Sequence, residues 1–240
     1  MSTVDNILSD SSNRYYPLPQ KKWKYYQEWH TTVFFHWEIP LYFIEEYIPD
    51  GLEIDTFNNM AWISLVSFEV KNMRLRNLPA FPYISNFQEI NLRTYVKKDG
   101  IQGIYLFSIE TNKLIQVLLS KIFIGLPYQK SEIIRSGNHL QSKNDELNHQ
   151  LDMVMRQNIP LKNKTILDTW LTERHALYEM INDELYRFDI HHKEWNLRGL
   201  DILIKEVFYQ AGNYTANTYP DIIHYADKLE VILWGREKTP

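Results

Sequence analysis

The stretch that decides the fold is Phe87-Gln88-Glu89-Ile90-Asn91-Leu92-Arg93-Thr94-Tyr95-Val96, in which polar and apolar residues alternate. Successive side chains of a β-strand point to opposite faces, so one face of this segment is polar and the other apolar. The polar face carries Glu89, Asn91, Arg93 and Tyr95. If the apolar face packs on a core, the polar face meets either bulk water or an enclosed pocket.

Both environments are open at this point. On a solvated face, Glu89 and Arg93 form a surface ion pair worth under ~1 kcal/mol. In a pocket, the guanidinium could bind a carboxylate through two hydrogen bonds while the Glu89 carboxyl group handles protons. The second environment makes Glu89 and Arg93 the candidate catalytic residues.

Composition limits the classes of protein that this chain can be. It has 240 residues, 44% of them apolar, a formal net charge of −4 and no cysteine. These values exclude disulfides and a thiol nucleophile and give no general attraction to nucleic acid or anionic lipid. No apolar run approaches the ~20 residues of a membrane-spanning helix. We expect a cytoplasmic protein with a flexible leader at residues 1–22 and a single domain at residues 23–240.

Turn and periodicity signals place the elements along the chain. Asn58-Asn59 and Asp99-Gly100 each separate two strand-like runs and predict tight hairpins, because Asn, Asp and Gly tolerate positive φ. Helical spacing predicts helices at 113–124 and 166–178, and a polar stretch at 136–148 reads as an exposed turn. Many strands with few short helices favour one curled sheet or a barrel.

Two sets of residues have competing interpretations. His36 and His192 end strand-like runs and could bind a metal with Glu89 or Glu173, yet no metalloprotease-type His-Glu-x-x-His spacing is present. We therefore expect structural or rim histidines, with no metal and no cofactor. Glu173 and Arg174 could point into a cavity mouth or form a pair on a helix surface.

Several segments, taken in order from residue 29 to residue 234, resemble the uncharacterised YqjF-like family, which shares the acetoacetate decarboxylase-like fold. The segments include His36-Trp37, Ile48-Pro49-Asp50-Gly51-Leu52-Glu53, the Glu-x-Asn-x-Arg-Thr-Tyr-Val core of 89–96, Gly125-Leu126-Pro127-Tyr128, Trp170-Leu171-Thr172-Glu173-Arg174, Ile190-His191-His192 and Val231-Ile232-Leu233-Trp234.

The resemblance implies a mainly β (α+β) protein. An antiparallel sheet would curl into a cone-like barrel around a central, partly polar cavity, with a few short helices. The resemblance also turns Glu89 and Arg93 inward. The ligand-binding residues that we then expect are Asn91, Tyr95, Tyr128, His36, Glu173, Arg174 and His192.

The lysine nucleophile of acetoacetate decarboxylase, the best-known enzyme with this fold, has no counterpart at the corresponding position of this chain. Acetoacetate decarboxylase forms a Schiff base through a lysine whose pKa is perturbed by a neighbouring lysine, after a Gly-x-Pro turn. In this chain the corresponding turn precedes Tyr128 and Gln129, and the nearest lysines are Lys121 and Lys130. The resemblance therefore does not predict Schiff-base decarboxylation.

The sequence thus predicts a small-molecule-binding protein whose polar central cavity takes a carboxylate or carbonyl compound. The alternative is an acid–base enzyme without a Schiff base, lyase- or hydrolase-like, acting on a small keto or hydroxy acid. A third option is a scaffold with a vestigial polar interior. Strand edges and the aromatic content (14%) also leave room for a homodimer.

Overall fold

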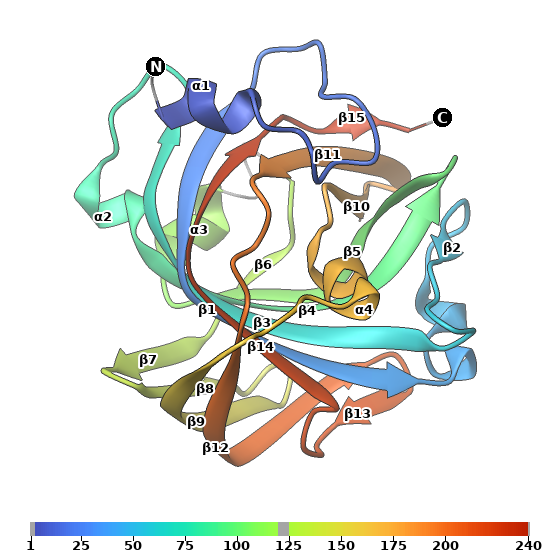
Figure 1. Cartoon of the computed structure of the whole chain (residues 1–240), viewed down its shortest axis with the longest axis vertical. Helices are drawn as coiled ribbons and strands as arrows, with labels where there is room; N and C mark the ends of the chain where they lie inside the picture. The colour runs from blue at the N-terminus through green and yellow to red at the C-terminus, as the bar shows by residue number, and fades with distance from the viewer. Residues whose placement is uncertain (1–2, 120–124, 240) are drawn as a thin grey trace.

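The computed structural model describes residues 3–119 and 125–239, in which a few short helices lie around a large sheet (Figure 1). The elements in chain order are α1 Thr3–Leu8, β1 Tyr25–Ile39, the 3-10 turns η1 Leu41–Phe43 and η2 Glu45–Tyr47, β2 Glu53–Ile54, β3 Ala61–Leu75, α2 Pro82–Ser85, β4 Phe87–Lys98, β5 Ile101–Thr111, α3 Leu114–Leu119, β6 Tyr128–Lys130, β7 Glu132–Ser136, β8 His139–Asn144, β9 His149–Pro160, α4 Ile166–Thr172, β10 Ala176–Ile181, β11 Glu184–His192, β12 Arg198–Ala211, β13 Tyr214–Ala216, β14 Ile222–Leu233 and β15 Glu237–Lys238.

The strands form a 15-stranded sheet, part of which closes into a ring in the order β11-β10-β5-β4-β3-β1-β14. The ring closes because the end of β11 pairs with the end of β14, with Ile190 opposite Leu233. The mainly β, curled-sheet architecture that the sequence predicts is confirmed. Pairing is antiparallel except that β5 runs parallel to β10 and to β6, because connections longer than hairpins separate these strands.

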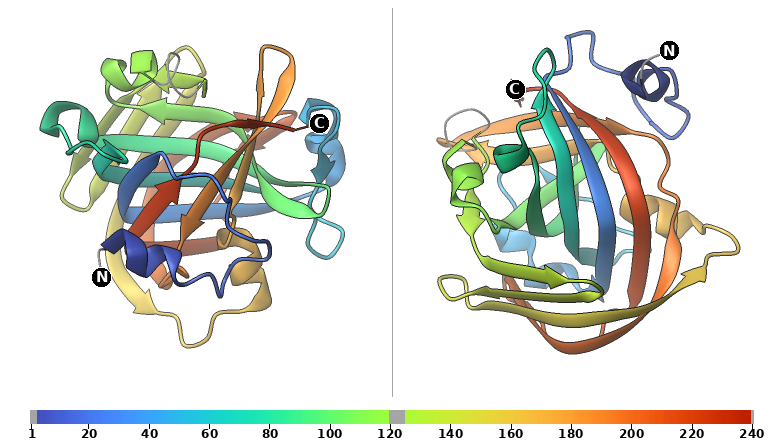
Figure 2. Two further views of the ribbon diagram at one scale, coloured as in Figure 1. Left: turned by 90° about the horizontal axis from the view of Figure 1, so that it is seen from above. Right: turned by 90° about the vertical axis from the view of Figure 1, so that its left-hand side faces the viewer.

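Strands β7, β8, β9 and β12 leave the ring and fold beneath β1, β3 and β4 (Figure 1; Figure 2, right). The central strands are therefore covered on both faces. One hydrophobic core lies inside the ring and includes Phe34, Val66 and Phe68. A second core lies on the opposite face of the same strands and includes Phe35 and Leu65. Adjacent residues of one strand thus belong to different cores, as the alternation of side chains requires.

A β-bulge lets both halves of β1 face the ring interior. Thr31 has a φ of 51°, and the register of β1 against β3 shifts between His30 and Val33. The extra residue reverses the parity of inward-facing positions. Odd positions such as Trp29 face inward before the bulge, and even positions such as Phe34 face inward after it.

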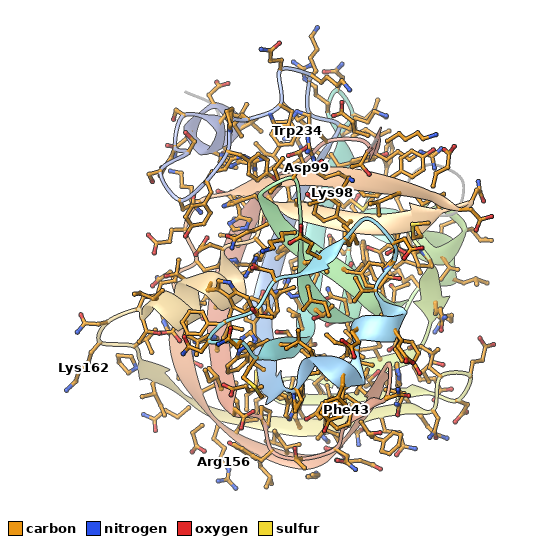
Figure 3. The ribbon with its side chains drawn as sticks, turned by 90° about the vertical axis from the view of Figure 1, so that its right-hand side faces the viewer. Phe43, Lys98, Asp99, Arg156, Lys162 and Trp234 are labelled. Carbon is orange, nitrogen blue, oxygen red and sulfur yellow. The ribbon has the colours of Figure 1, made fainter. Side chains whose placement is uncertain are left out.

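Both predicted turns form and use positive φ, but only Asp99-Gly100 joins two paired strands. At Asn58-Asn59 a single bridge between Phe57 and Met60 closes the turn, and β2 pairs with β4 rather than with β3. Asn58 and Asn59 have φ values of 52° and 64°, and Asp99 and Gly100 have φ values of 51° and 76°. The second turn joins β4 to β5 and thereby places the polar face of β4 beside β5. Figure 3 labels Lys98 and Asp99 at this turn, in the upper middle of the view.

Three predicted elements differ from the structure. The expected exposed turn at 136–148 contains β8, in which the buried Leu140, Ser142 and Asn144 alternate with the exposed Gln141 and Lys143, so its polar outer face hid the strand. The helix expected at 166–178 ends at Thr172, and the last residues of that range begin β10, which pairs with both β5 and β11. Of the helix expected at 113–124, the structure shows α3, and residues 120–124 lie outside the described residues.

The expected flexible leader packs on the domain over its described part, residues 3–22. Ile7 of α1 is 1% exposed. The Arg14 guanidinium forms an ion pair with Asp189 at 2.7 Å and donates to the Ile190 carbonyl at 2.6 Å. Apolar side chains also hold the segment: Val4, Ile7, Leu8 and Leu18 pack in one cluster with Tyr26, Ile232 and Trp234. No helix among the described residues is long and apolar enough to cross a membrane.

Candidate functional site

A cavity lies inside the ring and is lined mainly by apolar side chains. Its volume is about 90 Å³, several times the ~10–15 Å³ that one water needs. The lining residues are Tyr25, Gln27, Trp29, Thr32, Phe34, Val66, Phe68, Glu89, Asn91, Arg93, Ile104, Leu106, Ile109, Leu126, Tyr128, Leu177, Phe188, Ile190, Trp195, Leu233 and Trp234.

The polar face of β4 supplies the main polar groups of this cavity. Glu89, Asn91 and Arg93 are 5%, 6% and 7% exposed, so this face is enclosed rather than solvated. The apolar residues between them, Ile90 and Leu92, pack in the second core. Alternation along a strand covered on both sides therefore brings a carboxyl, an amide and a guanidinium to one wall.

Glu89 is a carboxyl group with a strongly altered acidity. Burial raises its pKa from 4.5 to about 7, because the charged form is poorly solvated inside the ring. Two hydrogen bonds act in the opposite direction. The Tyr128 hydroxyl donates to Glu89 Oε2 at 2.7 Å, and the Asn91 amide donates to Oε1 at 3.3 Å. A carboxyl group that changes charge near neutral pH can both give and take a proton.

Arg93 is a buried cation without an acidic partner among the described residues. Its Nη2 donates to the Leu171 carbonyl at 3.4 Å, and its Nε has no hydrogen-bond partner. The guanidinium lies 5.6 Å from the Phe34 ring centre, a distance that permits cation–π attraction. Burial lowers the pKa of Arg93, but an arginine in a protein remains charged. The arrangement suits an anionic group of a ligand.

Tyr95 and His36 belong to a hydrogen-bonded chain next to the cavity and are not among its lining residues. The Tyr95 hydroxyl lies 2.5 Å from Ser64 Oγ and donates to the Leu171 carbonyl at 2.9 Å. Ser64 Oγ lies 2.6 Å from His36 Nδ1. The Leu171 carbonyl therefore accepts hydrogen bonds from Tyr95 and Arg93 together and joins this chain to the cavity wall.

The same chain continues to the start of α4. His36 Nε2 lies 3.1 Å from His224 Nδ1, and His224 Nε2 lies 2.9 Å from Asp168 Oδ1. Burial and the nearby His224 lower the pKa of His36 well below its usual value. Asp168 also closes the capping box of α4 with Thr165. His36 is thus a buried neutral histidine, and sequence reasoning missed Asp168 because its partner is distant in the chain.

Glu173 and His192 form a separate buried cluster with His175, which sequence reasoning also missed. Their possible ligand atoms lie within 4.8 Å of one another, close enough to hold a metal ion. Glu173 already accepts hydrogen bonds from the Lys164 ammonium and from the backbone of Trp195. The Lys164 ammonium balances the charge of the Glu173 carboxylate. The metal grouping of His36 with His192 and Glu89 that the sequence left open does not form, because those residues lie in separate networks.

Arg174 is not on a solvated helix surface. It follows α4 and forms a buried ion pair with Asp55 at 2.6 Å. Its guanidinium lies 4.3 Å from the Trp170 ring centre and 4.8 Å from the Tyr95 ring centre. Glu173, Arg174 and His192 are outside the lining of this cavity, and their expected part in ligand binding stays a prediction.

No lysine lines the cavity in the described part of the chain. Tyr128 occupies the wall and bonds Glu89, whereas Lys130 is exposed and donates to the Ser131 carbonyl at 2.9 Å. Lys121 lies outside the described residues. The cavity as described therefore offers a hydroxyl where the family resemblance expects a lysine.

Comparison with known proteins gives one family match and several structural neighbours. The model of the DUF2071 family, described as an uncharacterized conserved protein, matches residues 26–230. The uncharacterized protein YqjF of Bacillus subtilis (strain 168) is 34% identical over 231 residues, covering 92% of this chain and 95% of YqjF.

Solved structures extend the likeness to the fold. The alignment with the acetoacetate decarboxylase of Legionella pneumophila covers 100% of this chain and 96% of the decarboxylase chain, at 12% identity and a TM-score of 0.60. The alignment with the enduracididine biosynthesis enzyme MppR, complexed with pyruvate, covers 94% of this chain and 93% of the MppR chain, at 10% identity and a TM-score of 0.59. At these identities the likeness establishes a shared acetoacetate decarboxylase-like fold.

Proposed function

Because the chain belongs to the DUF2071 family and has the acetoacetate decarboxylase-like fold, we propose that it binds a small carboxylate in its central cavity. The observation that carries the proposal is Arg93, a buried cation that faces the cavity without an acidic partner among the described residues. An unpaired buried charge is costly, and a ligand carboxylate would compensate it through charge-assisted hydrogen bonds. MppR, with the same fold, is described as complexed with pyruvate, a small carboxylate, which supports this ligand class.

The surroundings of Arg93 favour an anion of modest size. Glu89 lies on the same wall, but its raised pKa keeps a large fraction protonated near neutral pH, which limits repulsion of the ligand. Asn91 and Tyr128 hold the Glu89 carboxyl group through hydrogen bonds. The wall therefore presents the positive Arg93 guanidinium beside a carboxyl group that is partly protonated at neutral pH, inside a mainly apolar enclosure.

A thermal-shift panel tests the proposal. Pyruvate, acetoacetate, lactate and 2-hydroxybutanoate are added to the wild type, to Arg93→Gln and to Arg156→Gln. A ligand at about 100 times its Kd stabilises the folded state by about 2.7 kcal/mol, which raises Tm by roughly 5–10 °C for a chain of this size. Loss of the Arg93 charge removes about 1.5–3 kcal/mol of binding, or roughly ten- to a hundredfold in Kd.

Arg156→Gln is the matched control, because Arg156 lies on the outer surface (Figure 3) with a side chain 55% exposed. Each shift is measured against the same variant without ligand, so a general loss of stability does not imitate a loss of binding. The proposal fails if no acid stabilises the wild type. The role of Arg93 fails if Arg93→Gln responds as the wild type does.

The raised pKa of Glu89 supports a second candidate, an acid–base enzyme acting on a small keto or hydroxy acid. Glu89 would move the proton, and Arg93 would stabilise the negative charge of the carboxylate or enolate. This candidate predicts turnover of a panel acid that is lost in Glu89→Gln while binding persists. Borohydride treatment with acetoacetate or pyruvate should leave no adduct mass, and an adduct at Lys121 or Lys130 would contradict chemistry without a Schiff base.

A further inference from the structure

The unpartnered polar atoms of the cavity wall describe the ligand in more detail. Thr32 Oγ1, Asn91 Oδ1 and Arg93 Nε have no hydrogen-bond partner among the described residues. All belong to lining residues, and their side chains are at least nine-tenths buried. Buried polar atoms in folded proteins are normally paired, so these atoms define positions where a ligand supplies the missing groups.

The chemistry of these atoms differs, and it specifies different ligand groups. Arg93 Nε is a donor and requires an acceptor such as a carboxylate oxygen. Asn91 Nδ2 already donates to Glu89, which leaves Oδ1 as an acceptor that requires a donor. The Thr32 hydroxyl can donate or accept. A carboxylate alone satisfies Arg93 but leaves Asn91 without a partner.

Most of the remaining wall is apolar or aromatic; Gln27, a further amide in the lining, already accepts a hydrogen bond from Trp29 Nε1 at 2.7 Å. Trp29, Phe34 and Trp195 form an aromatic group in which Phe34 meets Trp195 edge-on, with centroids 5.1 Å apart. Trp29 and Trp195 stack at 6.0 Å. Val66 and Phe68 of β3 face the same space. This surface gains free energy by burying a hydrocarbon chain and offers no partner for a second charge.

We infer that the ligand is a short-chain hydroxy acid with an apolar tail, an inference that rests on the proposed function. The carboxylate binds Arg93, the hydroxyl donates to Asn91 Oδ1, and the tail packs against the aromatic wall. The cavity volume of about 90 Å³ corresponds to about six to nine water-sized groups at ~10–15 Å³ each. Acids from 2-hydroxypropanoate to 2-hydroxyhexanoate fall in that range, with about six to nine non-hydrogen atoms.

An amino acid fits this wall less well than a hydroxy acid. Its ammonium could also donate to Asn91, but desolvating an ammonium costs far more than desolvating a hydroxyl. Glu89 is the acidic group on this wall, and its carboxyl oxygens already accept from Tyr128 and Asn91. A keto acid, in turn, presents an acceptor to the Asn91 acceptor and leaves it unpaired.

Tryptophan fluorescence gives a direct readout, because Trp29 and Trp195 line the cavity. Kd is measured on the full chain for 2-hydroxy acids from three to eight carbons and for 3-hydroxybutanoate. At five carbons the comparators are 2-oxopentanoate, 2-aminopentanoate and pentanoate. We expect Kd to fall about fourfold for each methylene added up to six carbons, and 2-hydroxypentanoate to bind about tenfold more tightly than 2-oxopentanoate.

Two equally conservative variants distinguish an effect of cavity size on binding from a general effect of a smaller core side chain. Val66→Ala enlarges the cavity, whereas Val33→Ala makes the same change in the second core, and both parent side chains are buried. Val66→Ala should move the tightest-binding acid to a longer chain by about one methylene. Val33→Ala should leave the preferred chain length unchanged.

The outcomes distinguish this inference from the proposed function. If short and long acids bind equally, or if the keto or amino acid binds more tightly than the hydroxy acid, the inference is wrong while carboxylate binding stands. If no carboxylate binds, both fail. An equal response of Val66→Ala and Val33→Ala would contradict the placement of the tail against β3.

Discussion

At the scale of single residues, the charged groups of β4 owe their properties to where alternation puts them. Glu89 and Arg93 are both buried, and no ion pair joins them in the described part of the chain. The Glu89 carboxyl relies on Tyr128 and Asn91, and the Arg93 guanidinium relies on the Leu171 carbonyl. Each charge therefore stays available to a ligand rather than being neutralised by its neighbour.

The raised pKa of Glu89 makes a prediction about stability and pH. A carboxyl group whose pKa rises from 4.5 in the unfolded chain to about 7 in the folded protein binds its proton more tightly when folded. Its favourable contribution is complete below pH ~4.5 and is lost as the pH rises through ~7, by about 3 kcal/mol. Urea unfolding at pH 5 and pH 8 should show a smaller difference for Glu89→Gln than for the wild type. Glu46→Gln, at an exposed position, is the control and should retain the wild-type difference.

Sequence reasoning reached part of this wall. The alternation of β4, read with the family resemblance, placed Glu89, Asn91 and Arg93 on one inward face, and the Gly125–Pro127 segment pointed to Tyr128. Thr32 was missed because the bulge at Thr31 changes which alternate residues of β1 face inward. A bulge of one residue leaves no periodic signal in the sequence. The sequence did not reveal that Glu173 and His192 lie in another cluster, because a motif gives proximity in the chain and not direction in space.

At the scale of elements, the bulge of β1 determines which residues line the cavity. If β1 alternated regularly through Thr31, without the bulge, the even positions after it would face the second core. The cost of the bulge is local, since Thr31 is β-branched and has a φ of 51°. The bulge thus brings Thr32 and Phe34 into the cavity lining, and the pairing of β1 with β3 and β14 holds the strained backbone in place.

Substitutions at Thr31 measure that cost. Asn tolerates the left-handed region, so Thr31→Asn should stabilise the protein by about 1 kcal/mol. Thr31→Val keeps the branching at Cβ and should give no gain. Urea unfolding of both variants tests the prediction. Equal unfolding free energies for the two variants would show that positive φ at this position is not strained.

Elements were predictable where the residues of the segment themselves determine its backbone conformation. They were less predictable where pairing with distant strands determines it. Asn58-Asn59 and Asp99-Gly100 require positive φ, and the turns form as expected. Helical spacing at 166–178 described α4 only to Thr172, because β10 finds partners in β5 and β11 that no local pattern reveals. Strand β8 was hidden by its polar outer face, although its buried positions alternate regularly.

At the scale of the whole molecule, the N-terminal segment holds the ring closure from outside. Arg14 binds Asp189 and the Ile190 carbonyl of β11, the strand that closes the ring on β14. Figure 2 shows the segment crossing over this edge of the ring. The chain start and the barrel edge are thereby coupled, although they are far apart in sequence.

Two ion pairs of this segment should contribute unequally. Arg14→Ala leaves Asp189 buried with Arg187 as its remaining partner at 3.2 Å, and should cost about 2–4 kcal/mol of unfolding free energy. Lys21→Ala breaks an exposed pair with Glu237, whose side chains are 72% and 45% exposed, and should cost about 0–1 kcal/mol. Urea unfolding compares the two, and similar costs would mean that the segment is not anchored at Arg14.

The central claim is that the cavity inside the ring binds a small carboxylate at Arg93. A crystal structure of the wild type grown with 2-hydroxybutanoate tests it most directly. We predict the ligand inside the ring, with its carboxylate oxygens at hydrogen-bonding distance, about 2.7–2.9 Å, from the Arg93 guanidinium. A cavity without the acid at a saturating concentration, or an acid bound there with its carboxylate turned away from Arg93, would contradict the account.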